Sequence, residues 1–214
     1  MDGNKAEICP LCGSETVMFY ESRQRTYLRC GSCLSVMLSP EYYLSEEDEK
    51  KRYELHENDP DDPGYRDSVK TIVNAVRSDI KLPAHGLDFG SGPDPATAKM
   101  LRELGYTIDL YDPFFHKDPD KLKRKYDFIV CCEVIEHFKN PAEEFRSLSS
   151  LIKLGGLILC QTEIYGDDIE FPKWHYKNDA THIFFYHHKA FEWIRDNCGF
   201  SGCQVKGKVI VFAG

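Results

Sequence analysis

Apolar and amphipathic segments alternate from Gly86 to the end of this 214-residue chain. Strands are predicted over residues 86–89, 106–112, 126–132 and 157–163. Helices are predicted over residues 96–105, 141–156 and 188–200, and a closing hairpin over residues 202–214. Because strands that alternate with helices pair in parallel, we predict an α/β fold. It has a mostly parallel sheet with helices on both faces and a C-terminal antiparallel hairpin.

Two further helices are predicted ahead of this region. The first begins at Ser45, a good helix-capping residue with acidic residues behind it, and is expected to end near Asn58. The second covers residues 65–80. Its predicted apolar face consists of Val69, Ile72, Val73 and Val76.

Nine cysteines divide into a group of four and a scattered group of five. The group of four forms two CxxC pairs separated by 17 residues, namely Cys9, Cys12, Cys30 and Cys33. Two residues between cysteines let both thiolates face one ion, and the alternating segment between the pairs suits a hairpin. We therefore predict a small zinc ribbon over residues 1–45, with a structural Zn²⁺ held by protein ligands alone. The alternative interpretation is four unrelated buried cysteines.

The other five cysteines, Cys131, Cys132, Cys160, Cys198 and Cys203, are interpreted as packing residues. No partner that would activate a thiol can be read from their surroundings.

Composition excludes several classes of partner. The net charge of −8 argues against a broad basic face for duplex DNA. No apolar run approaches the roughly 20 residues that cross a bilayer, and the polar first residues lack the apolar core of a signal peptide. We therefore expect a cytoplasmic protein without a membrane partner. Oligomeric state is not predicted.

A glycine-rich turn follows the first strand of the α/β region. It contains Gly90 and Gly92, and the second strand ends in Asp112 about 20 residues later. Glycines in a strand–turn–helix unit let the backbone approach a ligand. The turn lacks the lysine of a triphosphate-binding loop, and Asp94 would repel a dinucleotide pyrophosphate. Adenosine that carries a positively charged sulfonium suits these acidic surroundings better.

Four segments of the chain resemble the sequence motifs of class I S-adenosylmethionine-dependent methyltransferases (type 11/12-like) and occur in the same order. They read LDFGSGPDP, IDLYDPF, YDFIVCCEVIEHFKNP and LIKLGGLILCQTE. The resemblance covers residues 86–214 and implies a Rossmann-like sheet with S-adenosylmethionine as cofactor. Together with the CxxC pairs and the two N-terminal helices, it leads us to expect a zinc ribbon (1–45), a helical linker or cap (46–82) and a methyltransferase domain (83–214).

The resemblance also implies a set of cofactor-binding residues: Asp88, Phe89, Gly90, Gly92, Asp112, Pro113, Phe114 and Glu133. Asp88, Gly90 and Gly92 would line the methionine end of the cofactor, and Asp112 would hold the ribose. Pro113 and Phe114 would flank the adenine, and Glu133 would face the methyl group.

Two features depart from the family pattern. Asp94 stands where a third glycine is usual, which would weaken cofactor binding or merely alter the turn. The segment between Asp112 and Tyr126 is too short for the family's third strand and helix. We therefore expect an adenine pocket that is either more open or closed by other residues.

Three histidines are candidates for catalysis. His137 follows the third strand, where a general base would lie, although a structural helix-end histidine is the alternative. His175 and His182 belong to a long aromatic loop, residues 174–186, which would form a lid over the acceptor or pack beneath the last helix. Residues 56–65 are a further candidate, in which His56 or Tyr65 would contact the substrate; a plain surface turn is the alternative.

The leading hypothesis is thus an active methyltransferase. We favour a small-molecule acceptor over RNA. An RNA surface would use Arg23, Arg25 and Arg29 together with aromatic residues of the ribbon, but nearby acids argue against it. The alternative is a zinc-ribbon binding protein with a non-catalytic or degraded cofactor pocket. An NAD-dependent oxidoreductase is disfavoured by Asp94.

Overall fold

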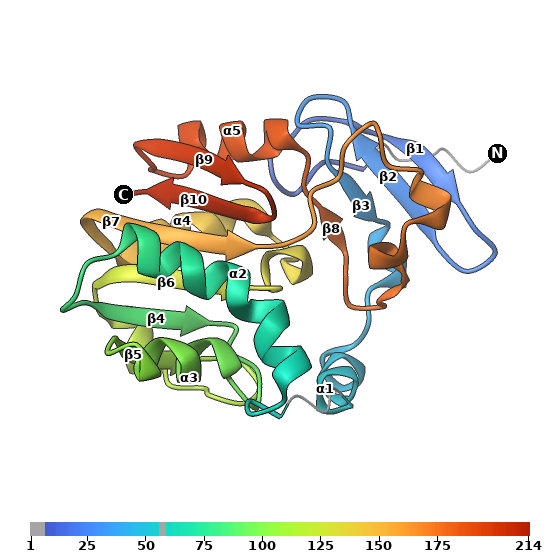
Figure 1. The fold of residues 1–214 in the computed structure, drawn as a ribbon. Coiled ribbons are helices and arrows are strands. Elements are labelled where there is room, and N and C mark those ends of the chain that lie inside the picture. Colours follow the sequence, from blue (N-terminus) through green and yellow to red (C-terminus); the bar gives the residue numbers. More distant parts are fainter. Residues whose placement is uncertain (1–6, 56–58) are drawn as a thin grey trace.

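Four parallel strands form the centre of the molecule, as the alternating pattern predicts. The computed structural model describes residues 7–55 and 59–214. The main sheet has the order β5-β4-β6-β7-β10-β9. Its strands are β4 (His85–Phe89), β5 (Thr107–Tyr111), β6 (Tyr126–Cys132), β7 (Ile152–Gln161), β9 (Gly202–Lys206) and β10 (Val209–Ala213). The first four in this order pair in parallel, and the β9–β10 hairpin adds antiparallel strands at one edge (Figure 1). The predicted fold class is confirmed.

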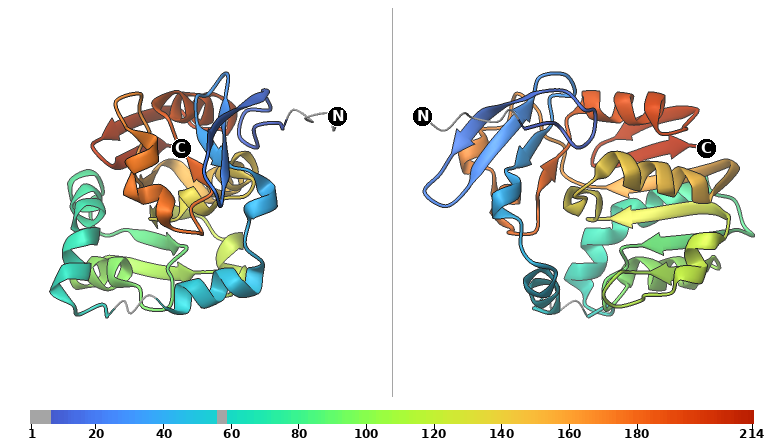
Figure 2. Two further views of the ribbon diagram at one scale, coloured as in Figure 1. Left: turned by 90° about the vertical axis from the view of Figure 1, so that its right-hand side faces the viewer. Right: turned by 180° about the vertical axis from the view of Figure 1, so that it is seen from behind.

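Helices cover both faces of this sheet. Helices α2 (Pro63–Asp79) and α3 (Ala96–Glu103) pack on one face, and α4 (Pro141–Leu151) and α5 (His188–Asn197) on the other (Figures 1 and 2). The four apolar residues predicted on the α2 face are all buried. Alternate residues of β6 enter the two cores, with Phe128 and Val130 on one side and Ile129 and Cys131 on the other.

The predicted helix over residues 141–156 is wrong at its C-terminal end. Helix α4 stops at Leu151, and the next residues begin β7. Ile152 pairs with Tyr126 of β6, and the Gly214 amide donates to the Gly156 carbonyl at 2.9 Å. Sheet hydrogen bonds on both sides of this segment therefore override its helical pattern.

The short segment after β5 contains no strand among its described residues. It holds only the 3₁₀ turn η2 (Pro119–Lys123), in agreement with the predicted lack of room. Strand β5 is therefore an edge strand.

The N-terminal module is a small antiparallel sheet completed by a distant part of the chain. Strands β1 (Thr16–Glu21), β2 (Thr26–Cys30) and β3 (Val36–Leu38) form a meander. Strand β8 (Phe184–Phe185) adds to its open side, with Val36 opposite Phe185 and Met37 opposite Phe184. Figure 1 shows β8 beside β3. The ribbon and the later aromatic loop thus share one sheet.

Helix α1 (Glu46–Glu54) lies beyond the carboxyl ends of the parallel strands (Figures 1 and 2). Ser45 caps it as predicted, since its hydroxyl accepts a hydrogen bond from the Asp48 amide at 3.2 Å. The helix ends before the expected Asn58, which, like His56, lies outside the described residues. No helix in the described ranges is long and apolar enough to cross a membrane.

Candidate functional site

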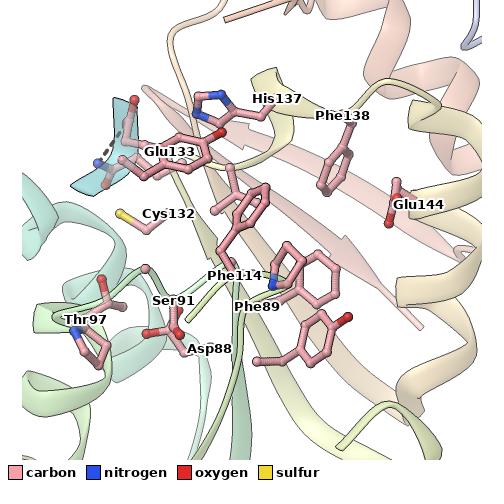
Figure 3. Close-up of a pocket in the computed structure, with 18 of the residues that line it drawn as sticks. Asp88, Phe89, Ser91, Thr97, Phe114, Cys132, Glu133, His137, Phe138 and Glu144 are labelled. Atoms are coloured by element: carbon pink, nitrogen blue, oxygen red, sulfur yellow. Dashed lines mark hydrogen bonds between the residues drawn. The ribbon is translucent and has the colours of Figure 1, made fainter. Parts of the chain in front are cut away.

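A cavity opens at the carboxyl ends of the parallel strands. The chain adds β5 on one side of β4 and then β6 on the other, so that the direction in which strands are added reverses at β4. The cavity lies at this reversal (Figure 3). Its volume is about 1290 Å³, more than the roughly 300–1,000 Å³ typical of small-molecule pockets. Open α/β sheets bind ligands at such reversals, so this cavity is the candidate site.

The turn between β4 and α3 approaches the end of β6 very closely. Gly90 has a φ of 73°, and a Cβ atom there would lie 2.6 Å from Cγ1 of Val134. The amides of Gly90 and Ser91 donate to the Tyr111 carbonyl at 2.8 and 3.2 Å. Gly92 also has a positive φ, 67°, but a Cβ there would meet no described atom within 4 Å. Gly90 is therefore required for packing, and Gly92 for the left-handed backbone.

Asp112 anchors this turn from the end of β5. Its Oδ2 accepts a hydrogen bond from the Gly92 amide at 3.0 Å, and its Oδ1 accepts from the amides of Phe114 at 2.8 Å and Phe115 at 3.1 Å. The residue is only 6% exposed and does not belong to the cavity lining. Its ribose-binding role stays a prediction. Its role in positioning the backbone was missed by sequence reasoning.

The other residues expected to hold a cofactor do line the cavity: Asp88, Phe89, Gly90, Gly92, Pro113, Phe114 and Glu133. Phe89 stacks on Tyr111 with ring centroids 5.4 Å apart. The buried Asp88 carboxylate accepts a hydrogen bond from the Ala98 amide at 3.1 Å, and burial raises its pKa to about 7. Asp94 is exposed and lies outside the lining, so it adds no carboxylate to the cavity.

Two carboxylates meet at the hydroxyl of Tyr176. Glu133 follows β6 with a φ of 53°, and its Oε1 accepts from Nε2 of Gln161 at 3.3 Å while its Oε2 accepts from the Tyr176 hydroxyl at 2.8 Å. Glu136 lies in the turn η3 (Ile135–His137), is fully buried, and bonds to the same hydroxyl through Oε1. Burial raises the pKa of both carboxyls to about 7, and the Glu136 charge contributes at Glu133.

His137 and His182 line the cavity beside these carboxylates, with ring centroids 4.9 Å apart. Nδ1 of His137 lies 2.8 Å from the Thr181 carbonyl oxygen, and Nδ1 of His182 lies 2.7 Å from that of Tyr176. Since a carbonyl only accepts, both Nδ1 atoms carry a proton. Burial lowers the pKa of His137. Burial, together with the neighbouring His137, lowers the pKa of His182 to about 4. Figure 3 shows Glu133 and His137 on one side of the cavity and Asp88 on another.

The structure does not bring His175 into this group. Its side chain is 77% exposed, outside the cavity lining, and its Nε2 lies 3.5 Å from Oε1 of Glu163. It lies in the turn η5 (His175–Asn178), which presents it to solvent. The catalytic role predicted for His175 therefore has no support in the geometry.

The aromatic side chains of the loop pack mainly on the ribbon, and not beneath the last helix as the second interpretation expected. Trp174, Tyr176 and Phe185 join Tyr27 in one buried cluster together with Phe171 of the turn η4 (Phe171–Lys173). Only the polar part of the loop, chiefly Asp179 and His182, reaches the cavity.

Helix α1 closes one side of the cavity, a role that its polar sequence conceals. Glu49 and Tyr53 line the cavity, and the Tyr53 ring lies 5.8 Å from that of Phe114. Glu49 pairs with Lys139 at 3.1 Å, and Arg52 pairs with Asp179 at 3.0 Å. These contacts tie the helix to the β6 end and to the loop. Tyr53 is the one aromatic residue of this charged helix, and the predicted linker or cap over residues 46–82 stays a prediction.

The four cysteines of the CxxC pairs converge. Their four sulfur atoms all lie within 4.8 Å of one another, with 3.7 Å between the sulfurs of Cys9 and Cys33 and 3.3 Å between those of Cys12 and Cys30. A tetrahedral zinc ion with bonds of about 2.3 Å separates its sulfur ligands by about 3.8 Å. The Ser32 amide also donates to the Cys30 sulfur at 3.4 Å. The donor set therefore fits zinc.

Two of the three ribbon arginines are engaged within the protein. Arg25 donates to the carbonyls of Lys177 and Asp179, at 3.2 and 3.4 Å. Arg29 pairs with Asp167 at 2.6 Å, and its guanidinium lies over the Phe19 ring. These contacts secure the loop to the ribbon.

The fold and the cavity define an α/β protein with a ligand site at the carboxyl edge of a parallel sheet. Residues 64–205 match the sequence profile of a family described as a methyltransferase domain. The chain belongs to this methyltransferase-domain family.

Two curated relatives share part of the chain. The ubiquinone biosynthesis O-methyltransferase of Erwinia tasmaniensis is 29% identical over 77 residues, which cover 36% of this chain and 32% of that protein. The enzyme of the same name from Shewanella halifaxensis is 27% identical over 91 residues, covering 42% and 39%. The similarity thus spans less than half the length of these relatives.

Two solved structures share the fold. A SAM-dependent methyltransferase from Archaeoglobus fulgidus has a TM-score of 0.55 at 16% identity, covering 70% of this chain and 94% of that one. The 1,6-didemethyltoxoflavin-N1-methyltransferase of Burkholderia thailandensis, solved with its acceptor and S-adenosylhomocysteine, has a TM-score of 0.55 at 12% identity, covering 92% and 98%.

Proposed function

We propose that this protein is an S-adenosylmethionine-dependent methyltransferase with a small hydroxyl-bearing acceptor. The proposal rests on one observation: a single cavity is lined both by the glycine turn and by Glu133, His137 and His182. The partial similarity to O-methyltransferases supports an oxygen acceptor. A degraded pocket is not favoured, because Asp94 lies outside the cavity.

Three features of the cavity support S-adenosylmethionine as its ligand. Gly92 leaves open space beside the turn, Phe89 and Phe114 offer flat apolar surfaces for a purine, and Asp88 places a carboxyl group nearby. When bound, S-adenosylmethionine supplies an electrophilic methyl group on a sulfonium, and transfer to an acceptor oxygen leaves S-adenosylhomocysteine and one proton.

The chain's own residues would position the acceptor. Helix α1 and the loop that carries His182 cover the cavity and limit the entry of water. His137 and His182 hold their unprotonated Nε2 atoms at the cavity, where they attract the proton of an acceptor hydroxyl. A small acceptor is preferred to RNA because Arg25 and Arg29 are engaged inside the protein.

The N-terminal module, in this proposal, is a zinc ribbon with a structural Zn²⁺ on the four CxxC cysteines. All its ligands come from the protein, so the ion takes no part in the transfer reaction. Residues 1–45, 46–82 and 83–214 would then act as ribbon, cap and methyltransferase domain.

Calorimetric titration with S-adenosylmethionine and S-adenosylhomocysteine tests the function. The wild-type protein should bind both, and Gly90→Ala should bind each about 10- to 100-fold more weakly. The added Cβ meets Val134 at 2.6 Å, and overpacking of this kind costs about 1–3 kcal/mol. Gly207→Ala is a matched control, because Gly207 has a φ of 63° with no described atom within 4 Å of a Cβ. Absence of binding to wild type would refute the proposal.

Closure by α1 can be tested separately. Arg52→Ala removes the ion pair with the largely buried Asp179 and should weaken S-adenosylhomocysteine binding about two- to fivefold, since such pairs contribute up to about 1 kcal/mol. Lys51→Ala on the same helix removes only exposed pairs with Glu47 and Asp48 and should leave the affinity unchanged. Equal affinities in both variants would show that the helix does not close the site.

A further inference from the structure

We propose that Glu136, His137 and His182 bind a divalent transition-metal ion at the acceptor end of the cavity. One ligand atom from each residue lies within 4.8 Å of the other two. Nε2 of His182 and Oε1 of Glu136 are 4.0 Å apart. An ion placed between these atoms would reach all three with small side-chain rotations.

Both histidines are already oriented as metal ligands are. Each Nδ1 atom donates to a backbone carbonyl, of Thr181 for His137 and of Tyr176 for His182. Metal-bound histidines use their second nitrogen in this way, which fixes the tautomer and leaves Nε2 with its lone pair. Nε2 of His182 faces Oε1 of Glu136 at 4.0 Å, which is beyond hydrogen-bond distance.

The buried charge beside the histidines also calls for a cation. Glu136 is fully buried, and its Oε2 atom has no hydrogen-bond partner within the described parts of the chain. Its neighbour Glu133 shares the single hydroxyl of Tyr176 with it, and one proton cannot serve two carboxylates. No described lysine or arginine forms an ion pair with either glutamate. A buried carboxylate oxygen without a hydrogen-bond partner, such as Oε2 of Glu136, is costly, and a metal ion offsets that cost.

The donor set selects the type of metal. Two imidazole nitrogens and one carboxylate suit Zn²⁺, Mn²⁺, Fe²⁺ or Co²⁺ better than Mg²⁺ or Ca²⁺, which prefer oxygen. Three protein ligands leave coordination positions open, unlike the closed four-cysteine site. Because His137 and His182 line the cavity, these open positions face the space for the acceptor.

This placement suggests a role that rests on the proposed function. With the ion bound, the Nε2 atoms of His137 and His182 would be its ligands and would no longer accept a proton. A hydroxyl oxygen of the acceptor would then occupy an open position, and the ion would lower its pKa, so that its proton leaves to water before methyl transfer. The ion would act through charge alone, with no change of oxidation state. The acceptor class is then a molecule with a hydroxyl group that can coordinate a metal, such as a phenol.

The test titrates the full-length protein with Mn²⁺, followed by calorimetry and electron paramagnetic resonance. Mn²⁺ is chosen because thiolate sites such as the four-cysteine cluster select zinc over manganese. Wild type should bind one Mn²⁺ per chain and gain thermal stability. Glu136→Gln and His182→Gln should each bind it at least 100-fold more weakly. Glu143→Gln and His188→Gln change the same residue types at exposed positions and should bind it like wild type.

Thermal melting without metal provides a second readout. Glu136→Gln removes a buried carboxylate and should melt at or above the wild-type temperature, whereas Mn²⁺ should no longer stabilise it. A wild-type protein that binds no Mn²⁺, or variants that bind it unchanged, would overturn the metal site. Parallel titration with S-adenosylhomocysteine separates the two proposals. Mn²⁺ binding without cofactor binding would leave the metal site standing and remove the methyltransferase function.

Discussion

Asp112→Ala is expected to weaken S-adenosylmethionine binding at least about 100-fold. The carboxylate accepts hydrogen bonds from the amides of Gly92, Phe114 and Phe115, and so fixes both the glycine turn and the segment expected to flank the adenine. Hydrogen bonds to a charged group contribute about 1.5–3 kcal/mol each, and tenfold in affinity corresponds to about 1.4 kcal/mol. If the variant loses the binding free energy of two such hydrogen bonds, its affinity for the cofactor falls by more than 100-fold. Calorimetry with S-adenosylhomocysteine, which does not decompose during titration, provides the measurement.

Asp94→Ala is the matched control for this experiment. Asp94 is an aspartate of the segment between Gly92 and α3, but it is exposed and lies outside the cavity. The affinity of Asp94→Ala for the cofactor should therefore stay within about twofold of wild type. Asp112→Asn retains an acceptor oxygen on one side only and should fall between the two. If Asp112→Ala bound the cofactor as tightly as wild type, the site would have to lie elsewhere.

Zinc removal should have the second large effect, and it should extend beyond the ribbon. We expect one zinc at the four cysteines of each chain and expect Cys30→Ser to lose it, because structural zinc supplies about 10–16 kcal/mol of folding free energy in small modules. Zinc is counted in a Glu136→Gln background, so that the second metal site proposed above does not contribute. Strand β8 pairs with β3, so hydrogen exchange should accelerate over residues 7–45 and also over residues 163–187. Strands β4 to β7 should remain protected, since their core lies between α2 and α4.

Cys203→Ser offers the comparison for this substitution. Cys203 lies on β9, far along the chain from the ribbon and outside the four-cysteine cluster, and its replacement should leave zinc content and exchange unchanged. Wild-type protein without zinc, or Cys30→Ser protein that keeps it, would contradict the structural role of the metal.

The parts of the fold that local patterns encode were predictable. The alternation after Gly86 specifies the parallel sheet, and the spacing of the CxxC pairs brings four sulfurs together. The boundary at Leu151 was not predictable, because strand pairing on both sides of β7 overrides a helical pattern. Strand β8 was not predictable either, because two phenylalanines are too short a pattern to indicate a strand. They form one only by pairing with the open edge of β3.

The candidate site divides in the same way. The glycine turn and Glu133 each follow the carboxyl end of a parallel strand. Because these ends meet at one edge of the sheet, the sequence was sufficient to predict that both lie at the cavity. His175 and His182 are seven residues apart in one loop and look equivalent in sequence. Only the packing of Trp174 and Tyr176 on the ribbon decides that one faces solvent and the other the cavity. The position of α1 depends on ion pairs with distant residues, for which the sequence offers no spacing rule.

The pairing of β3 with β8 has an evolutionary consequence. It makes the segment that presents His182 depend on the ribbon for its shape, while the glycine turn depends on the parallel sheet alone. Substitutions at Val36 or Met37 should therefore be accompanied, in descendants of a common ancestor, by compensating changes at Phe184 or Phe185. A chimaera that exchanged only the ribbon would inherit a mismatched acceptor end, whereas one that exchanged both segments together would acquire a new acceptor preference and keep its cofactor.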